Sequence, residues 1–379
     1  MNCIGIETFT GNPVKLTFDG AISSVEPSAD SSGLYLAPGF IDLQVNGFLG
    51  VDFNDPTCTP EEIARSIRGL FTTGVTRFYP TVITGSPDDM LAALRNLKCA
   101  QETLREGGAI DGFHVEGPHI SPDDGPRGAH PRRWVRPPDL DEFRRWQEAT
   151  GNQVRIVTLA PDWPQSLGYI EAITAEGVVA SIGHTNATAQ QLADAVSAGA
   201  TLCTHLGNGA HAVMRRHPNY LWEQLAEDRL MADFIVDGIH LPPSFLKVAL
   251  RAKTVARSVL VTDAAAPAGC PPGRYQLGEQ AVDLTADQRV VLAGQDRLAG
   301  SALRMDCGVE NLMRIAGLSL ADAVSMATTN AGRAGRVPGR AAGLVPGDRA
   351  DIIEYHFNKS DLSITIKATY ISGEKVYGA

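Results

Sequence analysis

Eight short runs rich in Val, Ile, Leu, Phe and Thr alternate with helical segments through the middle of this chain, and no other feature constrains the fold as strongly. Runs of this composition are typical of strands buried on both faces. A helix between two strands makes a right-handed crossover, so the strands are expected to be parallel. Eight such units predict an α/β fold closed into a (β/α)₈ barrel of the TIM type, with a doubly wound open sheet as the alternative. The eight runs are 39–46, 75–80, 111–116, 154–160, 178–184, 201–205, 231–237 and 258–263.

Helix start signals stand between several of these runs. Thr59 and Glu62 have the spacing of a capping box, with Pro60 at the first helical position. Thr188 and Gln191 repeat that spacing. Helices are therefore expected to begin directly after these threonines.

The two ends of the chain have a different pattern. Residues 1–38 and 338–379 contain short β-like pieces separated by Gly, Pro and Asp, which are typical of antiparallel strands with tight turns. We expect them to pair into a small β-sandwich domain, and the barrel to occupy residues 39–337 with a last helix over 319–335. The stretch 264–300 is too rich in Gly and Pro for a helix, so a long loop with a hairpin is expected over the barrel mouth.

Composition argues against several classes of protein. The formal charge of −10 is the opposite of what nucleic-acid binding requires, although one local cluster of Arg or His would suffice for a small anionic substrate. We find no run of ~18 apolar residues that would predict a membrane span, and no signal-peptide pattern in the first residues. The six cysteines are scattered without a C-x-x-C pair, which argues against disulfides and favours a cytoplasmic protein.

Four of the predicted barrel strands end in residues that commonly bind metals or move protons. Glu116, His184, His205 and Asp263 end the third, fifth, sixth and eighth strands. The carboxyl ends of the strands carry the chemistry in barrel enzymes. Each residue alone has a structural explanation, as a hydrogen-bonded histidine, a helix N-terminal acid or a turn residue. Together at one rim, the four residues predict an active site.

The chemistry of these residues fits a catalytic zinc ion. Two neutral imidazoles and a carboxylate leave a fourth zinc position for water, whose pKa bound zinc lowers to ~7. Glu116, His184 and His205 are the predicted ligands of this one divalent ion. Asp263 is then placed to accept the proton of the attacking water and to deliver it to a leaving amine.

Local sequences around these residues also resemble a known family. PGFIDLQVNG, HVEGPH, GHTNAT, THLGN and VTDAAAPAG, followed by LAGSAL and MATTNAGRAGR, are similar to the N-acetylglucosamine-6-phosphate deacetylases of the amidohydrolase superfamily. The resemblance runs from about Pro38 to Asp351. It implies a barrel with a small β domain made from both termini, and hydrolysis of N-acetylglucosamine-6-phosphate to glucosamine-6-phosphate and acetate. It also implies a homodimer.

The resemblance implies roles for individual residues. Glu116, His184 and His205 match the metal ligands, and Asp263 matches the general acid and base. His130 matches a histidine that helps the metal polarise the acetamide carbonyl and stabilise the oxyanion. The positions that match substrate contacts are Ala129, Asn208, Gly209, Arg216 and His240.

The first barrel strand departs from the H-x-H pattern with which many amidohydrolases hold a second metal. It carries Gln44 and Asn46 on one face instead, so we expect a single ion, zinc. These two residues either hydrogen-bond across the barrel or contact substrate or water. His119 is expected in the pocket wall rather than as a fourth ligand. His114, two residues before Glu116, is expected in the barrel core or behind a ligand.

The phosphate contact is the second departure. The chain reads Arg215-Arg216-His217-Pro218-Asn219 where the family often has G-R-E-P-G, and Arg216 matches the arginine by spacing. Arg127, Arg132 and Arg133 either bind an anion or are solvated loop charges. A phosphorylated substrate is expected, with a different N-acetylated sugar or amino-sugar derivative as the alternative.

Two other functions fit the sequence less well. A cyclic amidase of the dihydroorotase or hydantoinase kind would need H-x-H on the first strand and a lysine on the fourth, and 154–160 contains no lysine. A non-catalytic sugar-binding barrel would have no reason to keep three metal ligands together with Asp263.

Overall fold

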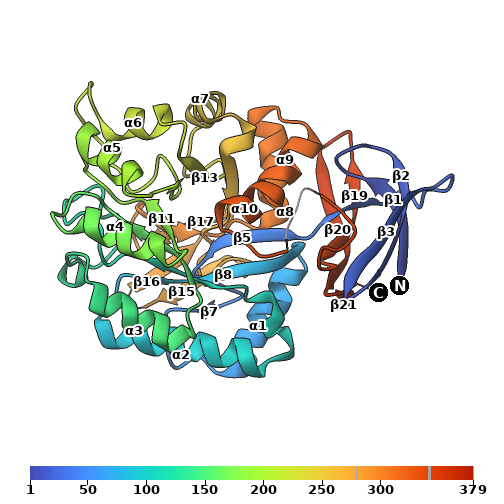
Figure 1. The fold of residues 1–379 in the computed structure, drawn as a ribbon, viewed down its shortest axis with the longest axis horizontal. Coiled ribbons are helices and arrows are strands. Elements are labelled where there is room, and N and C mark those ends of the chain that lie inside the picture. The colour runs from blue at the N-terminus through green and yellow to red at the C-terminus, as the bar shows by residue number, and fades with distance from the viewer. Residues whose placement is uncertain (279, 340–342, 379) are drawn as a thin grey trace.

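The computed structural model describes residues 1–278, 280–339 and 343–378, and its larger part is the predicted barrel (Figure 1). Eight parallel strands lie in the order β14-β13-β12-β11-β10-β9-β8-β5, and each of the eight predicted runs overlaps one of them, although β8 continues to Ile83, beyond its predicted run of 75–80. The strands are β5 (Phe40–Val45), β8 (Val75–Ile83), β9 (Phe113–Glu116), β10 (Val154–Leu159), β11 (Val179–Ile182), β12 (Leu202–Cys203), β13 (Met231–Ile235) and β14 (Ser258–Val261).

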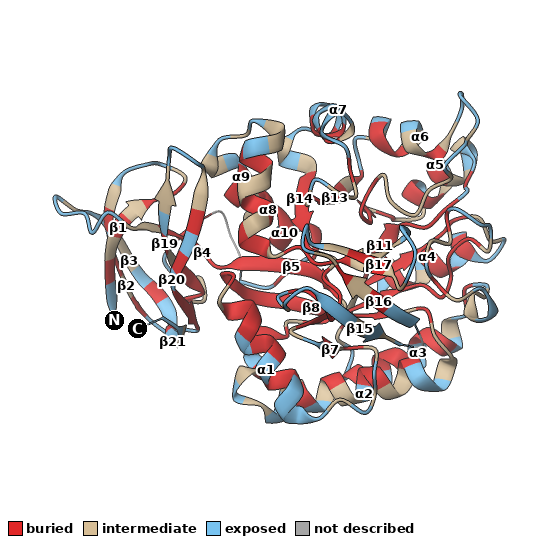
Figure 2. Cartoon of the chain, turned by 180° about the vertical axis from the view of Figure 1, so that it is seen from behind, coloured by how far each residue is buried: buried red, intermediate tan, exposed pale blue. Residues whose placement is uncertain are grey.

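Helices cover the outside of the barrel, and the strands between them are buried on both faces (Figure 2). The capping boxes predicted at Thr59 and Thr188 are both formed, and each hydroxyl accepts from the backbone N–H three residues on. The helices are α1 (Pro60–Phe71), α2 (Pro87–Thr103), α3 (Leu140–Thr150), α4 (Ser166–Ala175), α5 (Ala189–Ser197), α6 (Tyr220–Ala226), α7 (Pro243–Lys253) and α8 (Met305–Asn311). Short helical turns are η1 (Arg105–Ala109), η2 (Arg132–Trp134), η3 (Val255–Arg257) and η4 (Leu312–Ala316). Among the described residues, no helix has both the length and the apolar composition of a membrane span.

The last predicted helix, 319–335, is two helices, α9 (Leu320–Met326) and α10 (Thr329–Ala334). Ser319 caps α9 by accepting from the Asp322 N–H, as the sequence indicates. At Thr328 the backbone leaves the helical region, with φ −132° and ψ −90°. The Thr328 hydroxyl donates to the Val324 carbonyl, 2.7 Å away, and this local bond competes with the continuing helix.

The two ends of the chain form one seven-stranded sheet beside the barrel (Figure 1), in the order β21-β20-β19-β4-β1-β2-β3. Phe18 on β2 and Tyr370 on β20 lie with ring centroids 5.3 Å apart, although three strands separate β2 from β20 in the sheet. The sheet therefore folds over an apolar core of its own, as the predicted sandwich requires. Its strands are β1 (Asn2–Glu7), β2 (Pro13–Asp19), β3 (Ala21–Pro27), β4 (Tyr35–Pro38), β19 (Ile352–Asn358), β20 (Ser363–Ile371) and β21 (Glu374–Tyr377).

The predicted domain division, 1–38 with 338–379 against 39–337, stays a prediction. Residues 340–342 and 379 of the second terminal segment lie outside the described residues.

The segment after β14 contains more strand than the predicted loop and hairpin. It forms a four-stranded antiparallel sheet of β15 (Gly273–Leu277), β16 (Gln280–Leu284), β17 (Arg289–Leu292) and β18 (Leu298–Ser301). The Ala265 N–H donates to the Ser301 carbonyl at 2.9 Å, which ties this sheet to the end of β14. A two-stranded ribbon, β6 (Gly47–Phe48) and β7 (Val51–Asp52), follows β5.

A buried ionic network joins the barrel to the terminal sheet. Arg77 on β8, only 2% exposed, donates through Nε to Asp351 Oδ2 at 2.5 Å and through Nη1 to Asp111 Oδ2 at 3.2 Å. Asp351 lies directly before β19, is fully buried and also accepts from Arg349 Nε. Buried charges are tolerated only when they are paired in this way.

We expect Arg77→Met to lower the free energy of unfolding by about 3–5 kcal/mol, because it removes one partner of a buried ion pair. Urea denaturation measures the change. Arg68→Met is the matched control, since the Arg68 side chain is 46% exposed and its pairs with Glu61 and Glu106 are worth about 0–1 kcal/mol. Equal losses in the two variants would contradict a linking role for Arg77.

Candidate active site

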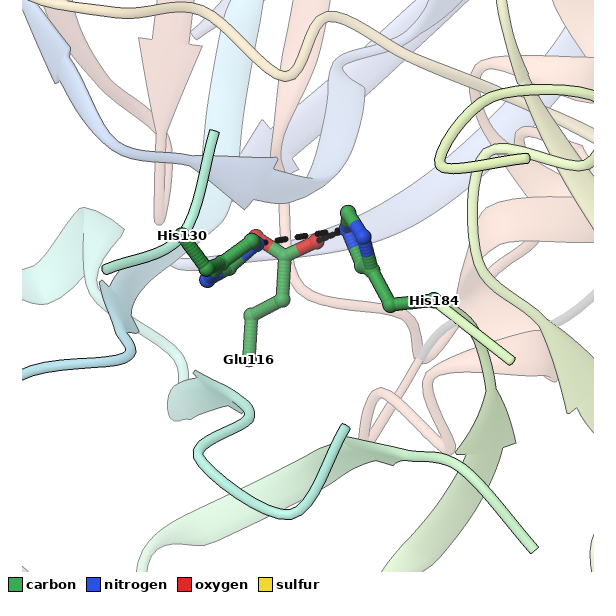
Figure 3. Close-up of side chains that lie close together, drawn as sticks. All are labelled: Glu116, His130 and His184. Atoms are coloured by element: carbon green, nitrogen blue, oxygen red, sulfur yellow. Dashed lines mark hydrogen bonds and ion pairs between the residues drawn. The ribbon is translucent and has the colours of Figure 1, made fainter. Parts of the chain in front are cut away.

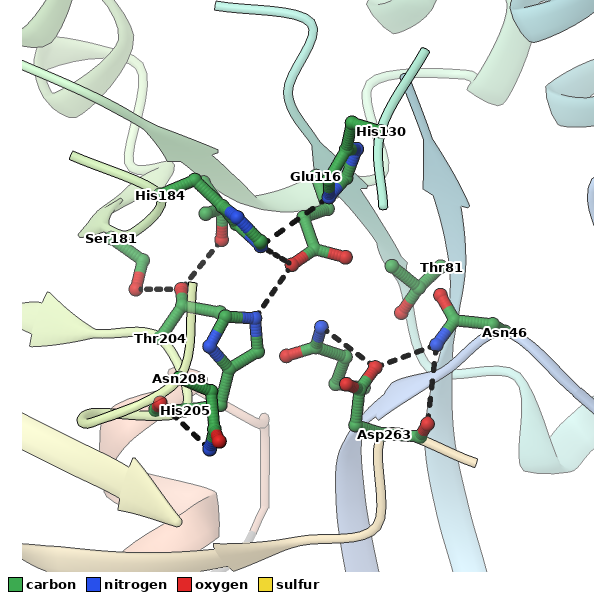
Figure 4. Close-up of polar contacts among 12 residues, drawn as sticks. Asn46, Thr81, Glu116, His130, Ser181, His184, Thr204, His205, Asn208 and Asp263 are labelled. Atoms are coloured by element: carbon green, nitrogen blue, oxygen red, sulfur yellow. Dashed lines mark hydrogen bonds and ion pairs between the residues drawn. The ribbon is translucent and has the colours of Figure 1, made fainter. Parts of the chain in front are cut away.

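Three predicted ligands converge at the carboxyl ends of β9, β11 and β12. Glu116 Oε1 lies 3.0 Å from His184 Nε2 and 2.8 Å from His205 Nε2 (Figure 4). All three side chains are buried. The structure thus brings together one carboxylate oxygen and two imidazole nitrogens from three separate strands.

The surroundings of His184 provide a test of whether a metal ion fits. Its Nδ1 lies 2.7 Å from the Pro126 carbonyl, which can only accept, so Nδ1 carries a hydrogen. In a neutral imidazole, Nε2 then presents its lone pair to Glu116 Oε1, and two acceptors at this distance repel each other unless a cation lies between them. A divalent ion held by Glu116 and both histidines removes the conflict, and this donor set suits zinc.

The charge at this point belongs to Glu116. Burial by itself raises the pKa of a carboxyl, but the close approach of the His184 and His205 rings outweighs burial and holds the pKa of Glu116 well below its usual range. The backbone N–H of His205 donates to the Asp233 carboxylate, which fixes the strand end that carries this ligand. Glu116 is therefore an anion at neutral pH.

His130 lies against the ligands rather than apart from them (Figure 3). Its Nε2 is 3.3 Å from His184 Nε2, and its Nδ1 is 2.8 Å from Thr84 Oγ1. Donor atoms of Glu116, His130 and His184 all lie within 4.8 Å of one another. Burial lowers the pKa of His130 to about 3, so its ring is neutral. The geometry suits either a hydrogen-bond donor to the substrate or a further metal ligand.

The loop that carries His130 is braced by one of the arginines singled out in the sequence. Arg127 Nη1 donates to the His130 carbonyl at 2.7 Å, and its Nη2 pairs with Asp124. Arg127 is therefore occupied within the loop. Arg132 and Arg133 lie in the short turn that follows, and both are exposed.

Asp263, directly beyond β14, faces the ligands from the opposite side of the site (Figure 4). Its Oδ1 accepts from Gln44 Nε2 at 3.0 Å and from Asn46 Nδ2 at 2.6 Å. The two amides of the Q-x-N sequence thus bind this carboxylate. Burial, and then the negative charge of Glu116, raises the pKa of Asp263 to about 6, a value at which the group can both take up and release a proton near neutral pH.

Three of these residues have left-handed backbone, which L-amino acids rarely adopt. The φ angles are 51° at His184, 29° at His205 and 49° at Asp263. Each residue lies shortly after the end of its strand. The left-handed conformation therefore stops the extended backbone at the point where the side chain faces the other site residues. Strained positions of this kind cluster at active sites.

The residues predicted to contact substrate lie at different distances from this centre. Gly209 packs on the His184 ring, where a Cβ would lie 2.6 Å from Nδ1, and Asn208 Nδ2 donates to the His205 carbonyl at 3.2 Å. His240 Nδ1 lies 2.6 Å from Asp237 Oδ2, which leaves Nε2 for a ligand. Ala129 and Arg216 are exposed on loops. Substrate contact stays a prediction for all five residues.

The two remaining histidines of the HVEGPH sequence are structural. His114 bonds the Leu43 carbonyl at 3.0 Å and Thr158 Oγ1 at 2.7 Å, in the barrel core as expected. The prediction that His119 lines the pocket is wrong. It is fully buried between the rings of Trp146 and Tyr169, at 5.6 and 5.1 Å, and takes the place of an aromatic ring in the layer under the helices.

Several residues that shape the site were not singled out in the sequence. Thr84, Pro126 and Asp233 act through a hydroxyl, a backbone carbonyl and a buried carboxylate that contact His130, His184 and His205 respectively. Asp42 could have been identified from the sequence, because its spacing of two residues from Gln44 and four from Asn46 places all three on one face of the strand. The contact from the Pro126 carbonyl could not have been identified, because any residue type has this backbone group.

Comparison with known proteins agrees with the geometry. The model of the amidohydrolase family matches residues 35–376. The N-acetylglucosamine-6-phosphate deacetylase of Bacillus subtilis (strain 168) is 34% identical over 332 residues, which cover 87% of this chain and 82% of the relative. The Homo sapiens protein of the same name is 35% identical and covers 97% of this chain, with 89% of the relative covered.

Solved structures give the same result. A variant of N-acetyl-D-glucosamine-6-phosphate deacetylase from Mycobacterium smegmatis, in complex with N-acetyl-D-glucosamine-6-phosphate, has a TM-score of 0.87 at 30% identity, and the match covers 99% of both chains. The Thermotoga maritima enzyme has a TM-score of 0.86 at 25% identity over the whole of both chains. This chain belongs to the amidohydrolase family and, within it, to the N-acetylglucosamine-6-phosphate deacetylases.

Proposed function

We propose that this protein hydrolyses the acetamide of N-acetylglucosamine-6-phosphate and releases glucosamine-6-phosphate and acetate. The observation that carries the proposal is the meeting of Glu116, His184 and His205 at one point, with the ionisable carboxyl of Asp263 facing them. The names of the relatives support the choice of substrate. An N-acetylated sugar or amino-sugar derivative without the phosphate is the alternative.

One zinc ion per chain would be held by Glu116 Oε1 and by Nε2 of His184 and His205. When bound, the ion supplies the positive charge that polarises the acetamide carbonyl and lowers the pKa of the attacking water. Gln44 and Asn46 direct their amide nitrogens at Asp263, an arrangement that supports a site for one ion rather than two.

Asp263 moves the proton in this mechanism. As water attacks the acetamide carbon, Asp263 takes its proton, and it returns that proton to the nitrogen as the C–N bond breaks. Gln44 and Asn46 hold Oδ1 of this carboxylate, which leaves Oδ2 for the transfer. A pKa of about 6 allows both steps near neutral pH.

His130 donates to the oxygen that becomes negative during the attack. For Nε2 to carry the hydrogen, Nδ1 must accept from the Thr84 hydroxyl, which lies 2.8 Å away. Because burial keeps the ring neutral, His130 can donate without adding a second full charge beside the metal.

The enzyme is expected to act in the cytosol as a homodimer. All six cysteines are free thiols, which suits a reducing compartment. Val213 is 89% exposed and Trp222 is 50% exposed on either side of the Arg216 loop, and exposed apolar groups of this size support a subunit contact there.

Asp263→Asn should reduce kcat by about 10²–10⁴-fold, because the amide cannot take the proton of the attacking water. Zinc should remain at one ion per chain. In the unaltered enzyme, kcat/KM should fall as the pH drops through about 6, where Asp263 gains a proton and stops acting as a base. Acetate release and elemental analysis measure these quantities, and near-normal turnover in the variant would refute the assigned role.

His130→Gln distinguishes the donor role from a ligand role. We expect kcat to fall by about 10²–10³-fold, as for the loss of one oxyanion donor, while zinc stays bound. His184→Gln is the control, and it should lose the metal. Loss of zinc from His130→Gln under the same conditions would make His130 a ligand.

Arg216→Ala tests the phosphate contact. For N-acetylglucosamine-6-phosphate, KM should rise by about 10–100-fold, since a hydrogen bond to a charged group is worth about 1.5–3 kcal/mol. For unphosphorylated N-acetylglucosamine it should stay unchanged. Arg144→Ala, at an exposed arginine on α3, is the matched control. If the unaltered enzyme releases acetate from both sugars equally well, the phosphorylated substrate is not the preferred one.

A further inference from the structure

Between β5 and β14, side-chain hydrogen bonds replace most of the backbone pairing that joins the other neighbouring strands of the barrel. Each strand from β5 to β14 pairs with its neighbour, but β14 and β5 are the two ends of the recorded strand order. Within the described part of the chain, one isolated bridge, between Val45 and Ala264, joins these two strands. Ala264 lies beyond Val261, the last residue of β14, so the residues of β14 itself need other contacts with β5.

Asp42 supplies those contacts. This fully buried carboxylate accepts from Thr262 Oγ1 at 2.5 Å through Oδ2 and from the Thr262 N–H at 3.2 Å through Oδ1. A side chain of β5 thus takes the backbone donor of Thr262 that a neighbouring strand would otherwise bind. The mechanism proposed above does not use Asp42.

The bond from Thr262 to Asp42 also sets the backbone around the proton-transfer residue. The Thr262 hydroxyl donates its hydrogen to Asp42 Oδ2 and keeps its lone pairs for another donor. That donor is the Ala264 N–H, 3.1 Å away. The Thr262 side chain therefore spans Asp263, whose φ is 49°, and holds it in a conformation that L-residues rarely adopt.

One face of β5 contacts this whole turn. Asp42 and Gln44 on β5, and Asn46 directly after it, alternate along the chain and point the same way. Asp42 binds Thr262, while Gln44 and Asn46 bind Asp263. The Asn46 N–H donates to the Ala264 carbonyl at 2.8 Å. The backbone position and the carboxylate orientation of Asp263 are thus set from the same three residues.

We propose that Asp42 and Thr262 are positioning residues for catalysis, which clamp the turn at Asp263 so that its carboxylate meets both the Gln44 and Asn46 amides. The inference rests on the proposed function. Both residues are buried, and their hydrogen bonds go to the turn around Asp263 and to β5. Their effect is transmitted through the left-handed turn and the two amide hydrogen bonds.

The test compares two substitutions at one position. Thr262→Val keeps the shape of the side chain but loses the hydroxyl, whereas Thr262→Ser keeps the hydroxyl. We expect kcat of Thr262→Val to fall by about 10–100-fold, the usual cost of losing a supporting hydrogen bond at such a site, with KM and zinc content little changed. Thr262→Ser should retain most of the activity.

The pH profile separates positioning from a general loss of structure. If the clamp loosens, Asp263 loses amide hydrogen bonds that favour its ionised form, so the acidic limb of kcat/KM should move to higher pH in Thr262→Val. A smaller folded fraction lowers kcat without moving that limb. Asp42→Asn, which replaces an acceptor oxygen by an amide, should lower kcat with KM and zinc content little changed, and it serves as the second variant if Thr262→Val does not fold. Because Asp42→Asn also removes a negative charge close to Asp263, the pH comparison is made on the Thr262 variants alone.

The outcomes are distinct. Absence of acetate release from the unaltered enzyme would overturn the proposed function. An active enzyme in which Thr262→Val has the kcat and pH profile of Thr262→Ser would overturn the clamp alone. Loss of zinc from folded Thr262→Val would also overturn it, since the threonine would then support the metal rather than Asp263.

Discussion

A single buried negative charge, on Glu116, organises the rest of the site. Placing a carboxylate in the interior costs several kcal/mol unless partners compensate it, and here two imidazoles point at the same oxygen. The Pro126 carbonyl fixes the His184 tautomer, and a divalent ion held by both imidazoles and the carboxylate would balance this charge. The same charge raises the pKa of Asp263, after burial, towards neutrality. The proposed metal binding and proton transfer thus depend on the same negative charge.

Two kinds of structure place the side chains around this charge: the barrel strands and the hydrogen bonds at the strand ends. Strands β9, β11, β12 and β14 bring Glu116, His184, His205 and Asp263, the residues proposed to bind metal or move a proton, to one rim of the barrel. The final orientation comes from short-range bonds at each strand end, such as Asp233 to the His205 N–H. Sites built this way combine the precision of a sheet with the conformational variety of loops.

The sequence predicted those features that depend on local pattern. Hydrophobic runs and capping residues such as Thr59 and Thr188 identified the strands and helix starts, and polar strand ends identified four side chains that lie at one rim. Features that depend on tertiary contacts were missed. His119 was misplaced because a histidine ring packs as an aromatic when Trp146 and Tyr169 surround it. The Pro126 carbonyl could not be found, since backbone groups leave no trace in residue type. The sheet of β15 to β18 depends on tertiary contacts, whereas the break at Thr328 accompanies a local bond to the Val324 carbonyl that residue type alone did not reveal.

The terminal sheet has a consequence for synthesis. Strand β4 pairs on one side with β1 and on the other with β19, which is translated only after the entire barrel. While the ribosome makes the barrel, the nascent chain carries an open edge at β4, and open edges invite pairing with other chains. The sheet closes last, so the first strands made are among the final ones to be protected.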